Sequence, residues 1–310
     1  MKKLLALGCA AIMLAAAAGF AACGSDAQIK GNYKEPTDEE LSSALDSIDA
    51  ERLFGDPDAA ERTFGISANA DVTLKMTAQS GSIDMNAGAE YAFLLAEETM
   101  TGAGNVTFSL DAEGVETLED TRMEAEICND GDYMYINAAL TEGEKERTLR
   151  GKFPFGTMPD LLSAAPDQLP SAPAGGAAQT PDIPGLVREL KEAGFEVGLD
   201  TADGVKLRIA ATEDFFTALE GLSATDGTPM EFTKTVLEIY LYVDSEGLFR
   251  QASVFADLAA DIKDAENPGT ASLNAEIVLK NADTAPVLPD DLDDPQKYPD
   301  LGGSGSAAGM

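Results

Sequence analysis

The sequence predicts an α+β protein that is mostly β, built on one large curved antiparallel sheet of about 11 strands. Such a sheet would form an open half-barrel with a few helices packed on its concave side. Long segments of the chain alternate apolar and polar residues, which is the period of a strand with one buried face. Short turn sequences rich in Gly, Asn and Asp separate these segments. Only three segments have apolar residues at helical spacing, and such helices cover the apolar face of a sheet.

The strands are predicted from the alternation itself. From Phe64 to Met76 apolar side chains occupy every second position, and the segments that follow repeat this pattern between turns such as residues 129–131 and 244–247. Because large twisted sheets curl, so many strands favour a half-barrel over a flat sheet. Strands are predicted over residues 64–76, 83–95, 106–110, 123–127, 132–137, 147–153, 195–199, 205–211, 233–243, 248–262 and 271–281.

Three helices are predicted from their start signals and apolar spacing. Thr37 is a suitable N-cap, and Glu40 three residues later completes a capping box. The apolar stripe that follows consists of Leu41, Leu45 and Ile48. Two further helices are predicted over residues 186–193 and 212–222, ahead of the second set of strands.

The remaining segments define the domain boundaries. Residues 36–290 are predicted to form one half-barrel domain, with residues 23–35 as a flexible tether and residues 291–310 as a disordered tail. Inside the domain, residues 157–184 contain six prolines together with Ala, Gly and Ser. We interpret this segment as a long loop, with one short helix possible near residues 159–164.

The first residues have the pattern of an export signal. Two lysines precede an apolar run from Leu4 to Ala18, which is shorter than the roughly 20 residues of a membrane-spanning helix. Ala21-Ala22-Cys23 then resembles a lipobox, the site at which a cysteine is acylated and the preceding residues are removed. We therefore expect residues 1–22 to be a lipoprotein signal peptide and Cys23 to carry a diacylglycerol anchor. The alternative is an ordinary signal peptide followed by a chance cysteine.

Charge and cysteine use limit the partners. Removing residues 1–22 takes the formal net charge from −34 to −36, because Lys2 and Lys3 are lost. A protein domain this acidic repels nucleic acid and anionic lipid surfaces. We therefore exclude nucleic-acid binding and expect the covalent lipid anchor to hold the protein at the membrane. Beyond Cys23 only Cys128 remains, so no disulfide is available within the domain.

Several of these features occur together in one known group of proteins. They are the lipobox at Ala21-Ala22-Cys23, the first helix from Thr37, the long strands from Phe64, the hairpin Asn129–Tyr133 followed by Tyr135-Ile136, and the late hairpin Asp244–Gly247. Together they resemble the LolA/LppX-like bacterial envelope lipoproteins over most of residues 36–290. The resemblance implies an unclosed, U-shaped barrel whose apolar groove, in the better-known members, carries lipid or acyl chains.

The sequence offers little for catalysis. It contains no histidine, which excludes Ser-His-Asp and Cys-His arrangements and histidine-based zinc sites, so we expect no enzyme activity and no cofactor. Cys128 has only acidic residues nearby and is interpreted as a core residue. Residues 290–294 lack the ligand spacing of a calcium loop and are interpreted as a solvated acidic turn, so no metal site is predicted.

One basic cluster needs its own interpretation. Lys145, Arg147, Arg150 and Lys152 alternate with acidic residues along one predicted strand. The cluster could contact an anionic headgroup or a protein partner. We favour a structural role, because charged residues on an edge strand prevent sheets from pairing edge to edge.

The apolar face of the sheet is the remaining candidate site. Its candidate groove residues are Met76, Met85, Phe93, Phe108, Leu207, Ile239 and Leu241. If helices fill this face, the residues form a core. If the helices leave a gap, methionine-rich walls suit a flexible acyl chain, and the alanines at positions 68, 70, 87 and 89 leave space for it.

Two functional hypotheses follow. The first is a membrane-anchored lipoprotein on the extracytoplasmic face of the bacterial cell envelope, which binds a lipid or another hydrophobic ligand in an apolar groove. The alternative is a surface interaction or structural lipoprotein with a filled core and no small ligand. Neither hypothesis identifies a protein partner from the sequence.

Overall fold

The computed structural model describes most of the predicted domain. It covers residues 27–48, 53, 63–79, 81–96, 99–115, 120–154, 183–225, 229–264, 268–282 and 286–301. The predicted signal peptide, Cys23 and most of the loop predicted over residues 157–184 lie outside these residues.

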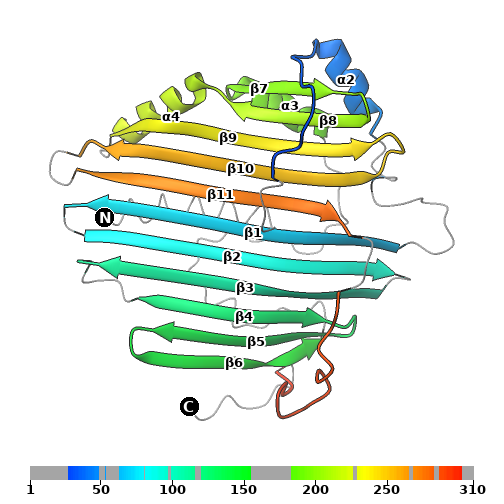
Figure 1. Cartoon of the computed structure of the whole chain (residues 1–310), viewed down its shortest axis with the longest axis vertical. Coiled ribbons are helices and arrows are strands. Elements are labelled where there is room, and N and C mark those ends of the chain that lie inside the picture. The colour runs from blue at the N-terminus through cyan, green and yellow to red at the C-terminus, as the bar shows by residue number, and fades with distance from the viewer. Residues whose placement is uncertain are drawn as a thin grey trace.

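Eleven strands form the described part of the sheet (Figure 1). They are β1 (Thr63–Ala78), β2 (Gly81–Ala96), β3 (Thr99–Glu113), β4 (Thr121–Asn129), β5 (Tyr133–Glu142), β6 (Lys145–Pro154), β7 (Phe195–Asp200), β8 (Gly204–Ala211), β9 (Met230–Asp244), β10 (Phe249–Ile262) and β11 (Gly269–Asn281). Each predicted strand has its counterpart among them, because long one-sided alternation leaves little choice of structure.

The strand order shows how the two sets of strands join. The order across the sheet is β6-β5-β4-β3-β2-β1-β11-β10-β9-β8-β7, and the neighbours pair antiparallel. One meander runs outward from β1 to the β6 edge, and the other runs inward from the β7 edge to β11. The meanders meet where β1 pairs with β11, with Val72 opposite Ala275. The sheet stays open, as the sequence predicts.

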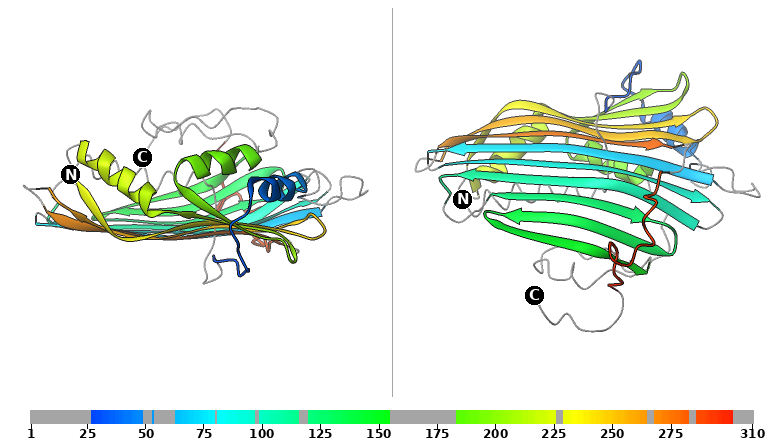
Figure 2. Two further views of the ribbon diagram at one scale, coloured as in Figure 1. Left: turned by 90° about the horizontal axis from the view of Figure 1, so that it is seen from above. Right: turned by 60° about the horizontal axis from the view of Figure 1, so that its bottom comes forward.

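Three helices lie on the same face of the sheet (Figure 2). They are α2 (Asp38–Asp46), α3 (Ile183–Glu192) and α4 (Glu213–Thr225). The predicted capping box starts α2: the Glu40 amide donates to the Thr37 hydroxyl over 3.2 Å, and the Thr37 amide donates to the Glu40 carboxylate over 2.8 Å. Helix α3 starts three residues earlier than predicted.

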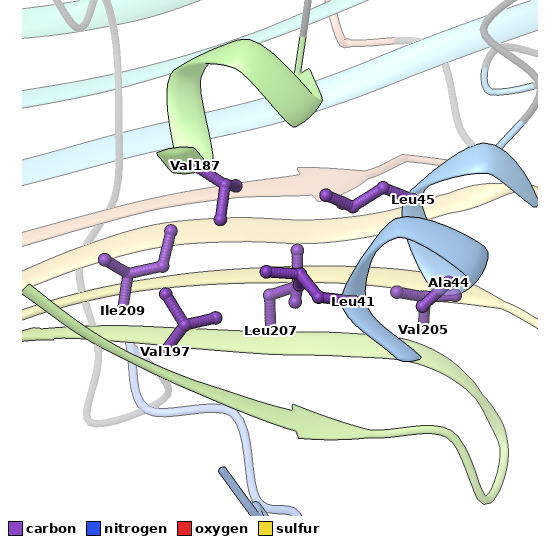
Figure 3. Close-up of a cluster of buried hydrophobic side chains, with 8 residues drawn as sticks. All are labelled: Leu41, Ala44, Leu45, Val187, Val197, Val205, Leu207 and Ile209. Atoms are coloured by element: carbon purple, nitrogen blue, oxygen red, sulfur yellow. The ribbon is translucent and has the colours of Figure 1, made fainter. Parts of the chain in front are cut away.

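A packed core lies between the helices and one end of the sheet (Figure 3). Helix α2 contributes its predicted apolar stripe, and β7 and β8 contribute the side chains that face it. The buried cluster consists of Leu41, Ala44, Leu45, Val187, Val197, Val205, Leu207 and Ile209. Burying each of the larger side chains stabilises the fold by roughly 1.5–3 kcal/mol, which holds these helices on this half of the sheet.

The opposite face of the sheet, here called the outer face, is largely polar, apart from apolar residues such as Val278 and Cys128 against which residues 27 and 292–298 pack. Between β1 and β2 the Thr73 hydroxyl donates to the Asn86 side-chain oxygen over 2.9 Å. One residue pair further along, Lys75 and Asp84 form an exposed ion pair at 2.6 Å. Because side chains alternate along each strand, this polar face is the other half of the same sequence pattern.

The N-terminal segment corrects the prediction of a flexible tether. Residues 27–34 lie across the outer face, where Ala27 is 2 % exposed and packs against Val278 and Phe255. At the far end of the segment, Lys34 exchanges backbone hydrogen bonds of 3.0 and 2.9 Å with Leu199 on the β7 edge. The segment pairs with an open strand edge, and alternation alone did not reveal this because the segment has no strand pattern of its own.

The C-terminal segment corrects the prediction of a disordered tail from residue 291. Residues 286–301 lie on the outer face at the other end of the sheet, where Tyr298 and Leu292 are buried against Tyr135 and Cys128. The Lys152 amide donates to the Pro299 carbonyl over 2.9 Å, beside the β6 edge. The segment was predicted to be disordered because most of its residues are acidic or polar, but its few apolar residues, such as Leu292 and Tyr298, hold it on the sheet.

Candidate functional site

The strand register places all seven candidate groove residues on the helix-bearing face. Leu207 lies opposite Leu241 across β8 and β9, and Ile239 is on the same face two residues earlier. In the other meander, Met85 lies opposite Leu74. The remaining members follow the same register: Met76 opposite Ile83, Phe93 opposite Ile66, and Phe108 opposite Ala87. The face itself divides into two parts that differ in what covers them.

The part over β7, β8 and β9 is filled. Leu207 is 1 % exposed and belongs to the cluster beneath α2 and α3. Ile239 and Leu241 are partly buried and pack against the same cluster. These three residues are therefore core residues, which agrees with the filled-core alternative for this half of the sheet.

The part over β1 to β5, here called the open apolar face, differs. Met76, Met85, Phe93 and Phe108 are half-buried and belong to none of the buried clusters among the described residues. At its margins Leu95 is 37 % exposed, and on β6 Leu149 is 39 % exposed. The packed contacts of the described helices instead involve β7, β8 and β9.

Further apolar side chains of the open apolar face were not singled out from the sequence. The ring of Phe64 lies 6.1 Å from that of Phe93 in an edge-to-face arrangement. Others are half-buried on β3, β4 and β5, among them Val106, Leu110, Met123, Ile127 and Leu140. Each continues the alternation of its strand, so the phase of the alternation, extended along every strand, could have identified them.

A tyrosine lies across the glycines of β3 on this face. A β-carbon at Gly102 would lie 2.1 Å from the Tyr91 hydroxyl, and one at Gly104 would lie 2.6 Å from the Tyr91 α-carbon. Only glycine therefore allows this ring to lie flat over β3. Burial raises the pKa of Tyr91. The ring adds a large, partly apolar surface to the open apolar face.

Small residues occupy the middle of β1 and β2. Ala70 lies opposite Ala89, and Val72 lies opposite Ala87. Toward one end of these strands stand Phe64, Phe93 and Tyr91, and toward the other stand Met76 and Met85. The central side chains are therefore shorter than those on either side. They project less from the sheet than the aromatic side chains at one end of the strands and the methionines at the other.

A large cavity that is lined by described residues lies away from the seven candidate groove residues. It has a volume of about 1170 Å³ between α2 and the turns after β7 and β9. Its lining includes the charged residues Lys34, Glu35, Glu39, Glu40 and Asp244. None of the seven candidate residues lines it. Its acidic walls do not suit an acyl chain, and Asp244 is already engaged by Arg250 at 2.5 Å.

Cys128 and the acidic turn at residues 290–294, two groups considered from the sequence, are held in structural contacts. Burial, together with the nearby Glu126 carboxylate, raises the pKa of Cys128 to about 11, so the thiol stays protonated and unreactive near neutral pH. No group of metal-ligating side chains occurs in the described part of the chain. In the acidic turn Asp291 pairs with Lys297 at 2.9 Å, and Leu292 is buried.

The basic cluster lies where an edge strand was predicted. Strand β6 forms one edge of the sheet, and the Lys145, Arg147 and Arg150 side chains are exposed. Lys152 lies 4.5 Å from the centre of the Tyr133 ring on the outer face. The register places Arg147 opposite Leu140 and Lys145 opposite Glu142 on the helix-bearing face, whereas Arg150 and Lys152 lie on the outer face. The cluster therefore borders the sheet edge on both faces, and Arg147 stands at the margin of the open apolar face.

No helix among the described residues is long and apolar enough to cross a membrane. No family model matches the chain, and no curated protein matches it. One solved structure that it resembles is a beta-barrel-like protein of the domain of unknown function DUF1849 from Brucella abortus. The likeness has 11 % identity and a TM-score of 0.12, and covers 71 % of this chain and 98 % of that one. The fold of this chain rests on the sheet described above.

Proposed function

We propose that the protein is a lipid-anchored, extracytoplasmic binding lipoprotein whose open apolar face takes a hydrophobic molecule, such as a lipid or an acyl chain. The observation that carries the proposal is the contrast between the two halves of one face. The β7–β9 half is packed under helices, whereas the half-buried Met76, Met85, Phe93 and Phe108 lie outside every buried cluster of the described residues.

The composition of the open apolar face suits a flexible ligand. Methionine side chains adapt their shape, and the aromatic rings at the other end provide rigid contact area. Each CH₂ group that such a ligand buries contributes about 0.8 kcal/mol. Micromolar binding corresponds to about 8 kcal/mol, and association costs at least about 4 kcal/mol more, so about 15 or more buried CH₂ groups are needed. Acyl chains of common lipids have this length.

The other parts of the proposal rest on the sequence. Attachment through an acylated Cys23 follows from the lipobox pattern, and so does a place on the extracytoplasmic face of the cell envelope. The proposal assigns no catalytic role, since the chain has no histidine and its one described thiol is buried.

A second candidate function is surface interaction without a small ligand. The filled half of the face favours it, because Leu207, Ile239 and Leu241 show that this sheet can bury its apolar side chains against its own helices. In that case a protein partner, in place of a lipid, would cover the open apolar face.

Native mass spectrometry distinguishes the two. The domain, expressed from Ser25 without its anchor, is measured before and after incubation with phospholipid and fatty acid. The proposal predicts a discrete added mass that extracts into organic solvent. A clean mass both as purified and after incubation would contradict ligand binding and favour the protein partner.

The anchor is tested separately. Full-length protein is expected to fractionate with membranes and to carry a mass increase on its N-terminal peptide, whereas Cys23→Ser is expected to be released. Equal fractionation of the two proteins, with no lipid on Cys23, would contradict the anchor and leave the binding proposal to be tested on its own.

A further inference from the structure

The course of the N-terminal segment relative to the two faces of the sheet carries an inference that rests on the proposed anchor. We infer that the anchored protein sits with its polar outer face toward the membrane that holds Cys23, and that the open apolar face points away from that membrane. Residues 27–34 are attached to the outer face, and only a short length of chain joins Ala27 to Cys23.

The first described residue is held firmly on the outer face. Ala27 is 2 % exposed, and its carbonyl accepts a hydrogen bond from the hydroxyl of Ser253 on β10. It also packs against Val278 of β11 and Phe255 of β10. The attachment point therefore lies on the central strands, on the side opposite the helices (Figure 2).

The residues that follow Ala27 fix the path of the N-terminal segment across the outer face. The Gln28 side chain donates to the Glu238 carboxylate over 2.9 Å, and Glu238 also accepts from Arg208 and, over 2.7 Å, from the Tyr240 hydroxyl. Further on, the Tyr33 ring lies 6.1 Å from that of Tyr240. Glu238 is 7 % exposed, so the segment covers a buried polar network and is not loosely laid on the sheet.

A glycine permits the passage to the sheet edge. At Gly198 on β7, a β-carbon would lie 3.0 Å from the β-carbon of Tyr33. The chain then pairs with Leu199 at the edge and turns over that edge to begin α2 on the other face. The segment thus wraps from the outer face to the helix-bearing face, and its beginning stays on the outer face.

The remaining chain is too short to reverse this geometry. Three residues lie between Cys23 and Ala27, so the four Cα–Cα steps from one to the other span at most roughly 14 Å. Reaching the far side of the helices would require about 10 Å along β11 to its end, and then about 15 Å more past the sheet and a helix layer. An acyl group on Cys23 can therefore enter a bilayer that faces the outer face, but not one that faces the helices.

The chemistry of the outer face fits this position. Its central strands present hydroxyl and amide side chains, among them Thr73, Asn86, Ser272 and Asn274, together with the carboxylates of Asp71, Glu90 and Glu276. The carboxylates oppose contact with anionic lipids, so this position fits a neutral headgroup layer. Such groups stay hydrated and do not insert, so the anchor supplies the attachment and the outer face lies against the headgroup layer. The open apolar face would then receive its ligand from the aqueous side or from a partner, not by lifting it directly out of the anchoring bilayer.

The test measures which face is nearer the membrane. Lipidated full-length protein is reconstituted into neutral phosphatidylcholine vesicles that contain a rhodamine-labelled lipid. In a Cys128→Ala background, one donor dye is placed on the outer face at Ser272→Cys. Matched donors are placed on exposed residues of the helix side, at Ser42→Cys on α2 and Leu222→Cys on α4.

The inference predicts more efficient energy transfer from Ser272→Cys than from either helix-side position. Equal transfer from all three, or greater transfer from the helix side, would overturn it. Lipidation is verified by mass on every sample and flotation is compared with Cys23→Ser. A protein that lacks the acyl group therefore reports failure of the proposed anchor, whereas an acylated protein with the wrong order of transfer reports failure of the orientation.

Discussion

Glu238 shows how one side chain connects the terminal segment to the sheet. It is buried beside Arg208, Tyr240 and Gln28, and it lies on the outer face of β9. Burial alone would raise the pKa of its carboxyl, but the hydrogen bonds from Arg208 and Tyr240 outweigh burial and hold it below its usual range. The ionised form is therefore the one that the fold stabilises.

Glu238→Gln is expected to lower the free energy of unfolding by about 1–3 kcal/mol at pH 7, because a hydrogen-bonded charge is lost. A depressed pKa contributes stability that is present above the unfolded pKa of about 4.3 and is lost as the pH falls through the folded pKa. The difference between wild type and variant, measured by urea unfolding, should therefore shrink from pH 7 to pH 3.5.

The matched control is Glu124→Gln, which changes an exposed carboxylate of the outer face. It is expected to alter stability by less than about 0.5 kcal/mol. If the two variants behaved alike at pH 7, the buried network would not hold the N-terminal segment.

Cys128 makes a second prediction at the same scale. Its thiol is 2 % exposed and has a pKa raised to about 11, so little thiolate exists below pH 9. In a protein with Cys23 acylated or replaced, a thiol reagent at pH 8 should label Cys128 only slowly until denaturant is added. Rapid labelling of the folded protein, at a rate similar to that of an exposed Thr107→Cys, would show that the C-terminal segment does not cover it.

At the scale of elements, alternation and capping predicted the strands, the helices and the side of the sheet on which each residue lies. These signals come from residues that are close together in the sequence. Thr37 and Glu40 alone mark a helix start. One-sided burial fixes which residues of each strand face the core. The two terminal segments have no such period. Their places depend on long-range contacts, such as Ala27 with Val278, which no short stretch of sequence encodes.

The same limit applies to the candidate site. Alternation correctly placed Leu207 and Met85 on one face, but it could not say which would lie beneath a helix. That depends on where α2 and α3 pack, and the register of β7 to β9 against them is a tertiary property. Sequence reasoning therefore treated a filled half and an open half as one groove.

The C-terminal segment gives the prediction at this scale. The Tyr298 ring meets that of Tyr135 edge to face at 5.3 Å, and both are 1 % exposed. Tyr298→Ala is expected to cost about 2–4 kcal/mol in urea unfolding, whereas Tyr298→Phe keeps the ring and should cost much less. Equal effects of the two variants would contradict packing of the segment.

Deleting residues 286–310 should have a second effect that the point variant does not. It removes the backbone partners of Lys152 and leaves the β6 edge open to pairing with another copy. We expect this deletion to form dimers or larger species in sedimentation velocity, while deletion of 302–310 alone leaves the described contacts in place. A strictly monomeric 286–310 deletion would show that the basic residues of β6 protect the edge by themselves.

At the scale of the whole molecule, one sheet combines a filled core with an open apolar face. The three helices stabilise the β7–β9 end, and the two terminal segments cover parts of the outer face and bond to the two sheet edges. Among the described residues, the packed helix contacts lie over β7 to β9, which makes the apolar side of β1 to β5 the candidate surface for a ligand. We propose that a hydrophobic ligand binds to this surface.

The most direct measurement of that claim compares two neighbouring residues of β3 that point to opposite faces. Phe108 lies on the open apolar face, and Thr107 is exposed on the outer face. A fluorescent fatty acid is titrated into wild type, Phe108→Glu and Thr107→Glu, each shown by circular dichroism and urea unfolding to be folded. We expect binding by wild type and by Thr107→Glu, with at least tenfold weaker binding by Phe108→Glu. Equal binding by all three folded proteins, or by none of them, would contradict this proposal.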